Sequence, residues 1–306
     1  MNDSVVAPPR SLRCAYLVMQ DAGDFVTDYE LAIGPMRELG WDVVEVPWRD
    51  PSIAWEDFDA VYICTPWDYP DEPQMFIDVL AAIDASSALL VNALPLVHWT
   101  LEKTYLRDLE ARGADIVPSA WFDTFDAEDV SACFATFHAD RIVVKPLIGA
   151  NAADTYVLES HSGEAILDEL ETVFHDRAFF VQPFIASIQT EGEYSLFYFN
   201  GDYSHAIQKT PKSGDFRVQE EHGADIQPLI PPRRLIDTAT DLVRLVEPRP
   251  MYVRADFVRG DDDRFLLMEL ELIEPSLYLR MDAGAPARFA AAFDCFVRAP
   301  VNTKTT

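Results

Sequence analysis

Residues 251–278 read MYVRADFVRGDDDRFLLMELELIEPSLY, and this stretch decides the fold. Tyr252–Val258 and Phe265–Leu270 are rich in apolar residues at strand spacing, and the acidic segment Gly260–Asp263 lies between them. Two such runs joined by a short turn that contains glycine predict an antiparallel β-hairpin. The rest of the fold is built outward from this hairpin.

Charged side chains interrupt both strands of the predicted hairpin. Side chains alternate between the two faces of a strand, so Arg254 shares a face with Asp256, and Glu269 shares a face with Glu271. Three clustered carboxylates repel one another unless a cation joins them, and oxygen ligands alone favour Mg²⁺. The alternative is an exposed face of ordinary charges, but the apolar residues between the acids make an idle buried cluster costly.

The segment around the hairpin predicts an antiparallel sheet with two helices. Tyr194–Phe199 and Tyr203–Gln208 are strand patterns separated by a short turn, and a helix is expected from Pro231 to about Val246. A last helix is expected at Ala285–Val297. The polar stretch Thr210–Pro228 has no regular pattern, so we expect a lid or binding loop, or disorder, there.

The middle of the chain predicts a compact unit in which strands and helices are mixed. After a helix at Leu101–Arg112, strands are expected at Ile142–Lys145, Thr155–Leu158 and Phe179–Phe184. A helix is expected between the last two strands, at Glu164–Phe174. This pattern indicates an α+β unit.

The N-terminal part predicts an open parallel α/β layer. The expected strands are Leu12–Met19, Asp42–Val46, Ala60–Thr65 and Ala88–Asn92. They alternate with helical patterns, of which Pro73–Ala85 is one. Ligands of such layers lie beyond the carboxyl ends of the strands, where the loops 20–25 and 65–71 are expected.

The expected division of the chain has three parts, and their charges differ. The parts are an N-terminal α/β domain at 1–97, a small central lid domain at 98–185 and an antiparallel C-terminal domain at 186–306. The whole chain carries −28, which argues against nucleic acid and anionic membranes as partners. The three parts carry −13, −10 and −5, so the last part concentrates cations, either for an anionic ligand or to balance local carboxylates.

The cysteines and the chain start favour a cytoplasmic protein. The four cysteines lie far apart in apolar surroundings, with no CxxC or Cys/His spacing, so free thiols are expected rather than disulfides or zinc. The first ten residues lack the apolar core of a signal peptide, and no apolar run is long enough to span a bilayer.

Further candidate residues are individually weak signals. Lys145 ends a buried strand immediately before a proline and is placed to direct a point charge into a cleft, although many such lysines only extend to solvent. Lys103 is expected on the preceding helix, where a surface position is the default. Lys209 and Arg217 lie in or beside the long polar loop, where cations suit closure over a phosphate.

The order of these signals carries more information than any one of them. The ordered set comprises Lys103, Lys145, Gln182-Pro183-Phe184-Ile185, Glu191-Gly192-Glu193, Gly214-Asp215-Phe216-Arg217, Arg254-Ala255-Asp256 and Glu269-Leu270-Glu271-Leu272-Ile273-Glu274-Pro275. Over about residues 98–285 this set resembles the ATP-grasp superfamily, in the branch of prokaryotic glutathione synthetase and the ribosomal-protein glutamate ligases. The segments TPWDY, TEGEYSLFYFNGDYSHAIQKTPKSGDFRVQEEHG and MELELIEPSLY are most similar to the subfamily of the cyclo-ligase of D-cycloserine biosynthesis.

The resemblance implies an ATP-grasp fold and a nucleotide site. Lys103 and Lys145 are implied to contact the ATP phosphates. The segment Gln182, Pro183, Phe184 and Ile185 is implied to hold adenine at a hinge, and Glu191 or Glu193 to bind the ribose.

The resemblance also implies the residues that handle the phosphoryl group. Arg217, Arg254 and Lys209 are implied to act in catalysis. Asp256, Glu269 and Glu271 are implied to bind Mg²⁺, as two ions.

Two features depart from the family pattern. Glu271 stands where the family usually has Asn, which adds a negative charge to the metal site. The loop Gly149–Asp154 has one glycine where the family loop over the phosphates is glycine-rich.

The implied function is a biosynthetic ligase that depends on ATP and Mg²⁺. It activates a carboxylate of a small amino-acid-like substrate as an acyl phosphate, which an amine or similar nucleophile attacks, with ring closure left open. The substrate residues are expected to be Asp21, Trp67, Asp68, Tyr69, Glu274 and Ser276. A peptide or protein ligase and a non-catalytic ATP-binding module are the alternatives, and a homo-oligomer stays open.

Overall fold

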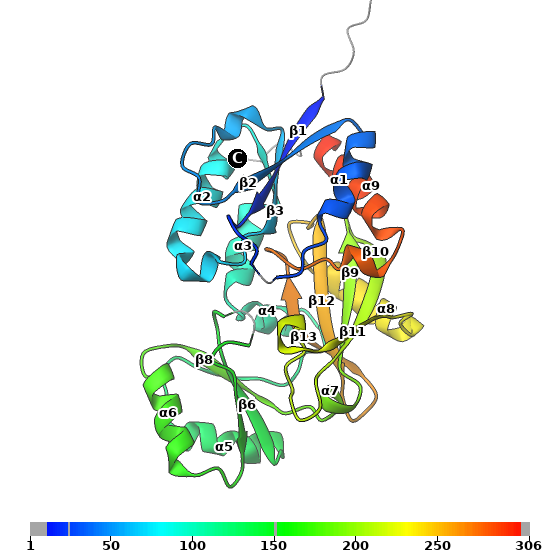
Figure 1. The fold of residues 1–306 in the computed structure, drawn as a ribbon. Coiled ribbons are helices and arrows are strands. Elements are labelled where there is room, and N and C mark those ends of the chain that lie inside the picture. The colour runs from blue at the N-terminus through cyan, green and yellow to red at the C-terminus, as the bar shows by residue number, and fades with distance from the viewer. Residues whose placement is uncertain (1–10, 24, 150–151, 301–306) are drawn as a thin grey trace, which may run out of the picture. The chain divides into compact units, whose positions relative to one another are not determined.

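The computed structural model describes residues 11–23, 25–149 and 152–300, and the chain forms two compact units (Figure 1). The first unit comprises the N-terminal part through Leu94 together with the chain from Glu274 onward. The second unit comprises Pro95–Ile273. The sheet of the first unit is parallel and the larger sheet of the second unit is antiparallel, as the sequence predicts. The smaller sheet of the second unit is also antiparallel, a direction that the sequence reasoning left open.

The first unit is built on a four-stranded parallel sheet of order β2-β1-β3-β4. Its strands are β1 (Leu12–Val18), β2 (Trp41–Pro47), β3 (Ala60–Thr65) and β4 (Leu89–Val91). Its helices are α1 (Glu30–Glu38), α2 (Pro73–Ala85) and α9 (Ala285–Arg298), with short 3₁₀ turns η1 (Trp55–Asp57), η2 (Tyr69–Asp71) and η4 (Leu279–Met281). Alternation of buried strands and helices along the sequence produces this parallel layer.

Helix α9 completes the core of the first unit. Phe293 packs edge-on against Trp41 at 5.3 Å between ring centroids, and Phe289 lies 5.2 Å from Tyr62. All four side chains are almost completely buried. Residues 274–300 therefore group with the N-terminal part, and the predicted division of the chain into three domains at 1–97, 98–185 and 186–306 stays a prediction.

The second unit contains a five-stranded antiparallel sheet of order β11-β10-β9-β12-β13. Its strands are β9 (Glu193–Phe199), β10 (Asp202–Thr210), β11 (Asp225–Pro228), β12 (Tyr252–Arg259) and β13 (Phe265–Glu271). Around it lie α3 (Leu94–Leu101), α4 (Tyr105–Ala111), α7 (Ser187–Thr190), α8 (Arg233–Val243) and the 3₁₀ turn η3 (Glu220–His222). The hairpin that the opening stretch predicts is β12–β13.

A second antiparallel sheet of this unit has the order β5-β8-β6-β7. Its strands are β5 (Ala120–Phe122), β6 (Arg141–Pro146), β7 (Tyr156–Glu159) and β8 (Phe179–Pro183), and its helices are α5 (Ala127–Phe137) and α6 (Glu164–Phe174). Val144, Val181 and Phe174 lie in the apolar core that joins this sheet to its helices. The strand β5 and the helix α5 were not predicted.

Two local predictions were wrong. The helix expected at Leu101–Arg112 is interrupted, because α3 ends at Leu101 and α4 begins at Tyr105, so Lys103 lies in the connection rather than on a helix. The polar stretch Thr210–Pro228 contains β11, whose residues pair with β10. In the described part of the chain, none of the helices has both the length and the apolar character that crossing a bilayer requires.

Candidate functional site

The three acids of the β12–β13 hairpin converge as predicted. Asp256 on β12 lies directly opposite Glu269 on β13, and Arg254 lies opposite Glu271. One carboxylate oxygen from each of Asp256, Glu269 and Glu271 lies within 4.8 Å of the other two. The alternation of side chains along two paired strands is the reason that these groups share one face.

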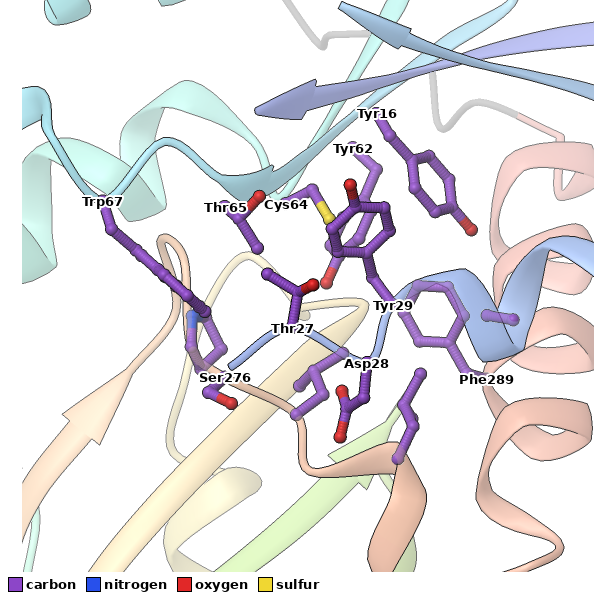
Figure 2. A pocket seen from close by; sticks show the side chains of 14 residues that line it. Tyr16, Thr27, Asp28, Tyr29, Tyr62, Cys64, Thr65, Trp67, Ser276 and Phe289 are labelled. Atoms are coloured by element: carbon purple, nitrogen blue, oxygen red, sulfur yellow. The ribbon is translucent and has the colours of Figure 1, made fainter. Parts of the chain in front are cut away.

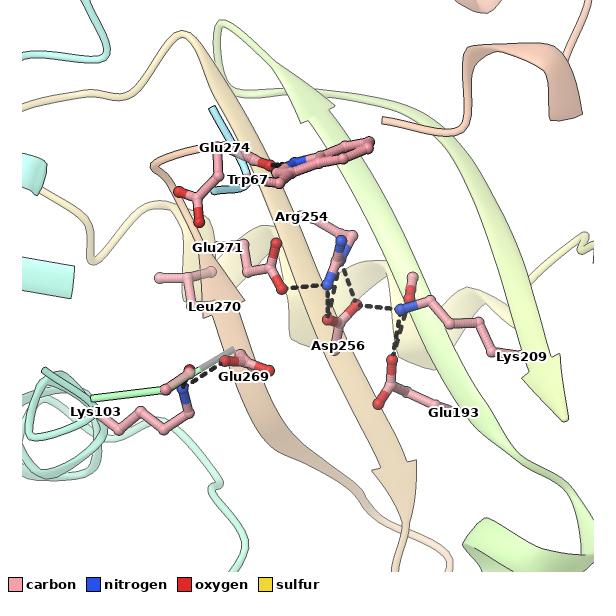
Figure 3. A network of polar contacts seen from close by, with 12 residues as sticks. Trp67, Lys103, Glu193, Lys209, Arg254, Asp256, Glu269, Leu270, Glu271 and Glu274 are labelled. Carbon is pink, nitrogen blue, oxygen red and sulfur yellow. Dashed lines mark hydrogen bonds and ion pairs between the residues drawn. The ribbon is translucent and has the colours of Figure 1, made fainter. Parts of the chain in front are cut away.

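Cationic side chains hold these carboxylates in the structure (Figure 3). The Arg254 guanidinium donates to Asp256 at 3.0 Å and also to Glu271. The Lys103 ammonium lies 2.9 Å from Glu269. Each acid is thus paired with a cation that comes from a neighbouring strand position or from the connection between α3 and α4.

Lys209 and Glu193 extend the network into the sheet. They face each other in the β9–β10 pairing, and the Lys209 ammonium donates to Glu193 at 2.8 Å and lies 3.8 Å from Asp256. The side chains of Lys209, Glu193 and Asp256 are only 6%, 7% and 2% exposed. Buried charges of this kind are tolerated because each has an opposite charge beside it.

Burial shifts the pKa values of several groups at the site. It raises the pKa of Glu271 to about 7, with Arg254 opposing the shift and the charge of Glu269 adding to it. It also raises the pKa of Glu193, which Lys209 opposes. Burial lowers the pKa of Lys145 to about 8.

The acidic cluster fits a divalent cation of the Mg²⁺ class. All of its donors are carboxylate oxygens, which are the ligands that this hard cation prefers. In this structure Lys103 and Arg254 partly neutralise these carboxylates. Carboxylates this close together need positive charge beside them, which a bound cation would also supply.

Lys145 and Gln182 meet on the second sheet of this unit. The Lys145 ammonium donates to the Gln182 side-chain oxygen at 2.9 Å, and the Gln182 amide donates to Ser119 Oγ at 3.0 Å. The Lys103 ammonium also donates to the Gly149 carbonyl at 2.9 Å. Two residues of the predicted glycine-poor loop, 150 and 151, lie outside the described residues.

The predicted adenine hinge, residues 182–185, begins in strand β8, which ends at Pro183. Phe184 and Ile185 pack against a buried apolar cluster that includes Val258 and Leu266. The Arg141 guanidinium lies 3.9 Å from the centre of the Phe184 ring. The segment therefore presents an apolar surface edged by a cation.

Two predicted residues have other partners. Glu191 pairs with Arg259 at 2.8 Å and accepts from the Tyr194 hydroxyl at 2.7 Å, and the Arg259 guanidinium lowers its pKa. The Arg217 side chain, 41% exposed, hydrogen-bonds Asp215 at 2.8 Å, and within the described residues it makes no ion pair with the acidic cluster. Their predicted roles in ribose binding and catalysis stay predictions.

The predicted substrate residues belong to the first unit and divide into two sets. Asp68 accepts from the Trp48 indole at 2.6 Å and from Arg49, and Tyr69 stacks on Phe76 at 4.7 Å. The Asp21 carboxylate caps a turn by accepting from the Gly23 amide at 2.9 Å. These three side chains make local contacts within the unit.

Trp67 and Ser276 do line a pocket of the first unit (Figure 2). The Trp67 indole donates to the Glu274 carbonyl at 2.9 Å, which fixes the ring at the pocket. Thr27 and Asp28 also line the pocket, although the sequence reasoning missed them. Both precede helix α1 directly, beyond the carboxyl end of β1, which is the signal that could have found them.

A buried tyrosine at the acidic cluster was also missed. The Tyr105 hydroxyl of α4 accepts from the Leu270 amide at 2.9 Å, and Leu270 stands between Glu269 and Glu271. This contact joins residues 165 positions apart, so no local pattern could have indicated it.

The chain is similar in sequence to known proteins. Residues 14–92 match the family described as the N-terminal domain of D-cycloserine synthetase DcsG. The chain is 28% identical over 294 residues to the cycloserine biosynthesis protein DcsG of Streptomyces lavendulae, covering 90% of this chain and 96% of that protein.

Solved structures extend the comparison to the fold. The crystal structure of D-cycloserine synthetase DcsG matches with a TM-score of 0.82 at 26% identity, over 94% of this chain and 100% of that one. The ATP-grasp ligase PsnB complexed with a minimal precursor matches with a TM-score of 0.66 at 15% identity, over 93% and 99% of the two chains. The macrocyclase MdnC of Microcystis aeruginosa, bound to the precursor peptide MdnA, gives 0.65 at 14%, over 92% and 98%. The chain therefore has the fold of ATP-grasp ligases and is an ATP-dependent ligase that forms C–N bonds, and its residues 14–92 match the model of the D-cycloserine synthetase N-terminal domain family.

Proposed function

We propose that this ligase activates the carboxylate of a small amino-acid-like substrate and joins it to an amine or similar nucleophile, within the same molecule where a ring is formed. The observation that carries the proposal is the convergence of Asp256, Glu269 and Glu271 with Arg254 and Lys103 on one face of the hairpin. The 28% identity to the cycloserine biosynthesis protein DcsG favours a small substrate over a peptide.

The reaction needs activation because a carboxylate is a poor electrophile. The γ-phosphoryl group passes from ATP to a carboxylate oxygen, which gives ADP and an acyl phosphate. The nucleophile's nitrogen then attacks the carbonyl carbon and forms the C–N bond. The bond between this carbon and the phosphate oxygen breaks, phosphate leaves with its electron pair, and the nitrogen loses a proton. Positioning and charge neutralisation are the protein's main contributions to such a transfer.

The residues of the acidic cluster and its cations have complementary tasks in this proposal. Mg²⁺, held by Asp256, Glu269 and Glu271, supplies neutralisation of the phosphoryl oxygens when it is bound. Arg254 and Lys209 are placed beside these acids to compensate the negative charge that develops during transfer. Arg217 is expected to contribute from its loop.

Nucleotide binding is proposed for the second sheet of the same unit. Lys103 and Lys145 supply the charge for the phosphates, and Lys145 is oriented by Gln182. Phe184 and Ile185 supply the apolar surface for adenine.

The test is ADP formation by the purified chain with Mg²⁺ and ATP, across a panel of D- and L-amino acids and their side-chain derivatives. Stimulation by one class of small substrate is expected. Release of ADP that requires an added peptide would instead favour a peptide ligase. Tight ATP binding with no ADP release across the panel would favour a non-catalytic module.

Two substitutions test the residues of the proposed site. Asp256→Asn and Lys145→Ala are each expected to lower turnover by about 10²–10³, the scale for losing one preorganised electrostatic contact. Asp237→Asn, which changes an exposed acid paired with Arg233 on α8, is the matched control and should leave turnover unchanged. Near-normal turnover in both site variants would reject the assignment.

A further inference from the structure

The pocket of the first unit has a chemical character that the ligase assignment does not explain. It lies between the segment that leads into α1, the end of β3 and the segment that follows Glu274 (Figure 2). Its lining contains the carboxylate of Asp28 together with aromatic and hydroxyl side chains, and no lysine or arginine stands among the described residues that line it. A pocket with these groups favours a cation.

Asp28 is the charged group of the pocket. Its side chain is 8% exposed, and burial raises its pKa, which contacts with Arg280 oppose. The Arg280 side chain and backbone amide donate to the same oxygen, Oδ2, at 3.1 and 3.2 Å. The Leu279 backbone amide also contacts this carboxylate. An ionised carboxylate accepts about four hydrogen bonds, so the group retains capacity to accept from a ligand while Arg280 and Leu279 hold it in place.

Aromatic rings surround this carboxylate. Tyr29, Tyr62 and Trp67 all line the pocket, and their ring faces attract a positive charge. Burial raises the pKa of the Tyr29 hydroxyl, and the carboxylates of Glu45 and Glu30 act in the same direction.

A second observation points independently to a ligand. The hydroxyl of Tyr16, whose side chain is completely buried, has no hydrogen-bond partner among the described residues although Tyr16 lines the pocket. A buried hydroxyl without a partner costs free energy in the isolated protein. A polar ligand group or a water that accompanies it would satisfy this hydroxyl.

The size of the pocket limits the ligand. The empty space between the lining side chains is about 330 Å³, and this volume includes the mouth of the pocket that opens to solvent. The enclosed inner part is narrow. A primary ammonium group is small enough for such a space, whereas a guanidinium or a quaternary ammonium is larger.

We propose that this pocket binds the primary ammonium group of the amino-acid-like substrate, with Asp28 as its counter-charge. The inference rests on the proposed function for the identity of the substrate, but the pocket binds its ammonium without ATP. Thr27 and Ser276 supply hydroxyl oxygens that accept from the same group, and Trp67 closes one side.

The experiment measures binding of simple amines to the full chain without nucleotide, by ligand-observed NMR titration. The probes are D-serine, L-serine and ethanolamine, with N-acetyl-D-serine as the compound that lacks the ammonium charge. A serine isomer and ethanolamine are expected to bind, and N-acetyl-D-serine to bind at least about tenfold more weakly, the scale of one lost hydrogen bond to a charged group. Equal binding of N-acetyl-D-serine, or no binding of any amine at millimolar concentrations, would overturn the proposal.

Two variants locate the binding. Asp28→Asn should weaken amine binding at least about tenfold, whereas Asp294→Asn, which alters an acid of the same unit that pairs with Arg298, should leave it unchanged. Tyr16→Phe removes a hydroxyl without a partner, so it should keep or raise the melting temperature and still weaken binding severalfold. Wild-type affinity for the amines in both variants would contradict the proposal. If Asp28→Asn folds poorly, wild-type affinity in Tyr16→Phe alone would contradict it.

The inference and the proposed function fail in different ways. Suppose that amines bind in a way that depends on Asp28 but no amino-acid derivative stimulates ADP formation. This result would reject the proposed ligase substrate and support the proposed ammonium pocket. Amino-acid-dependent ADP formation with the same Michaelis constant in wild type and Asp28→Asn would reject the pocket and keep the ligase.

Discussion

At the scale of single residues, Lys145 combines burial with a proposed task, binding of the nucleotide phosphates, that needs its charge. Burial lowers its pKa to about 8; the carboxylate of Glu269 opposes this shift and the ammonium of Lys103 adds to it. The lysine is therefore cationic at neutral pH and neutral above about pH 8. Nucleotide affinity that depends on this charge must fall as the pH rises.

The prediction is a rise in the dissociation constant of ADP between pH 7 and 9, approaching about tenfold per pH unit above the pKa. Isothermal titration calorimetry of wild type and Lys145→Met measures it, without metal so that metal hydroxides do not form. Lys145→Met should bind more weakly and lack this part of the pH dependence. The same pH dependence in both proteins would show that Lys145 does not contact the phosphates.

Tyr105 contacts the backbone of the acidic cluster. Its hydroxyl is the acceptor for the Leu270 amide, so Tyr105→Phe leaves a buried N–H unpaired at a cost of about 1–3 kcal/mol. The backbone between Glu269 and Glu271 then loses the hydrogen bond that joins it to α4. The Mg²⁺ concentration for half-maximal activity should rise severalfold, which a titration of ADP formation against Mg²⁺ measures.

Tyr198→Phe provides the control for Tyr105→Phe. The Tyr198 hydroxyl donates to the Ile236 carbonyl at 3.2 Å, and it lies in the same sheet on β9. This variant should lose stability without a change in the Mg²⁺ requirement. Equal Mg²⁺ requirements in the two variants would leave Tyr105 with a merely structural role.

At the scale of elements, a single glycine sets how β9 begins beside β10. Gly192 has φ +90°, and a Cβ atom there would clash with the Lys209 carbonyl oxygen. Gly192→Ala should therefore destabilise the protein by about 3 kcal/mol or more, from backbone strain and displacement of the partner strand. Thermal unfolding followed by circular dichroism measures the effect.

Gly34→Ala is the matched control for this substitution. Gly34 lies inside α1, and a Cβ atom there meets nothing within 4 Å. Because Pro35 follows, alanine at this position gains little as a helix former, but it should lower the melting temperature far less than Gly192→Ala. A melting temperature of Gly192→Ala equal to that of wild type would show that the strands adjust at no cost.

Elements with strong periodicity were the ones the sequence could predict. Ala60–Thr65 and Pro73–Ala85 were predicted with the observed bounds, and β12 and β13 within one residue, because alternation and helical spacing are local properties. Strand β11 is four residues of mixed polarity, so its pairing with β10 rather than its own sequence makes it a strand.

The part of the candidate site that depends on local periodicity could also be predicted from the sequence. The convergence of Asp256 with Glu269 follows from strand alternation, and the structure brings these acids together. The pairing of Glu191 with Arg259, and the contact of Tyr105 with Leu270, depend on segments that are distant in the sequence. No single-sequence pattern encodes such contacts.

At the scale of the whole molecule, the two units should respond separately to their own perturbations. Phe293→Ala removes a completely buried ring that packs on Trp41, which should destabilise the first unit by about 3–5 kcal/mol. The proposed nucleotide residues all belong to the second unit. Mg²⁺ and ATP should therefore still raise the melting temperature of the second unit in this variant.

Differential scanning calorimetry with and without Mg·ATP checks this prediction. Stabilisation of about 2.7 kcal/mol is expected at a nucleotide concentration 100 times the dissociation constant, and chelation of the metal with EDTA should reduce it. Phe293→Leu, which keeps most of the apolar volume, should have an intermediate effect. Loss of the Mg·ATP response in Phe293→Ala would show that the first unit is needed for nucleotide binding.

The order of the chain through the two units determines the order in which they are completed during synthesis. The sheet of the first unit is translated first, but its core needs Phe289 and Phe293, which the ribosome adds only after the whole of Pro95–Ile273. The second unit is continuous in sequence and can fold as soon as it emerges. The unit that is begun first is therefore finished last, and until then Trp41 and Tyr62 expose apolar surface that chaperones recognise.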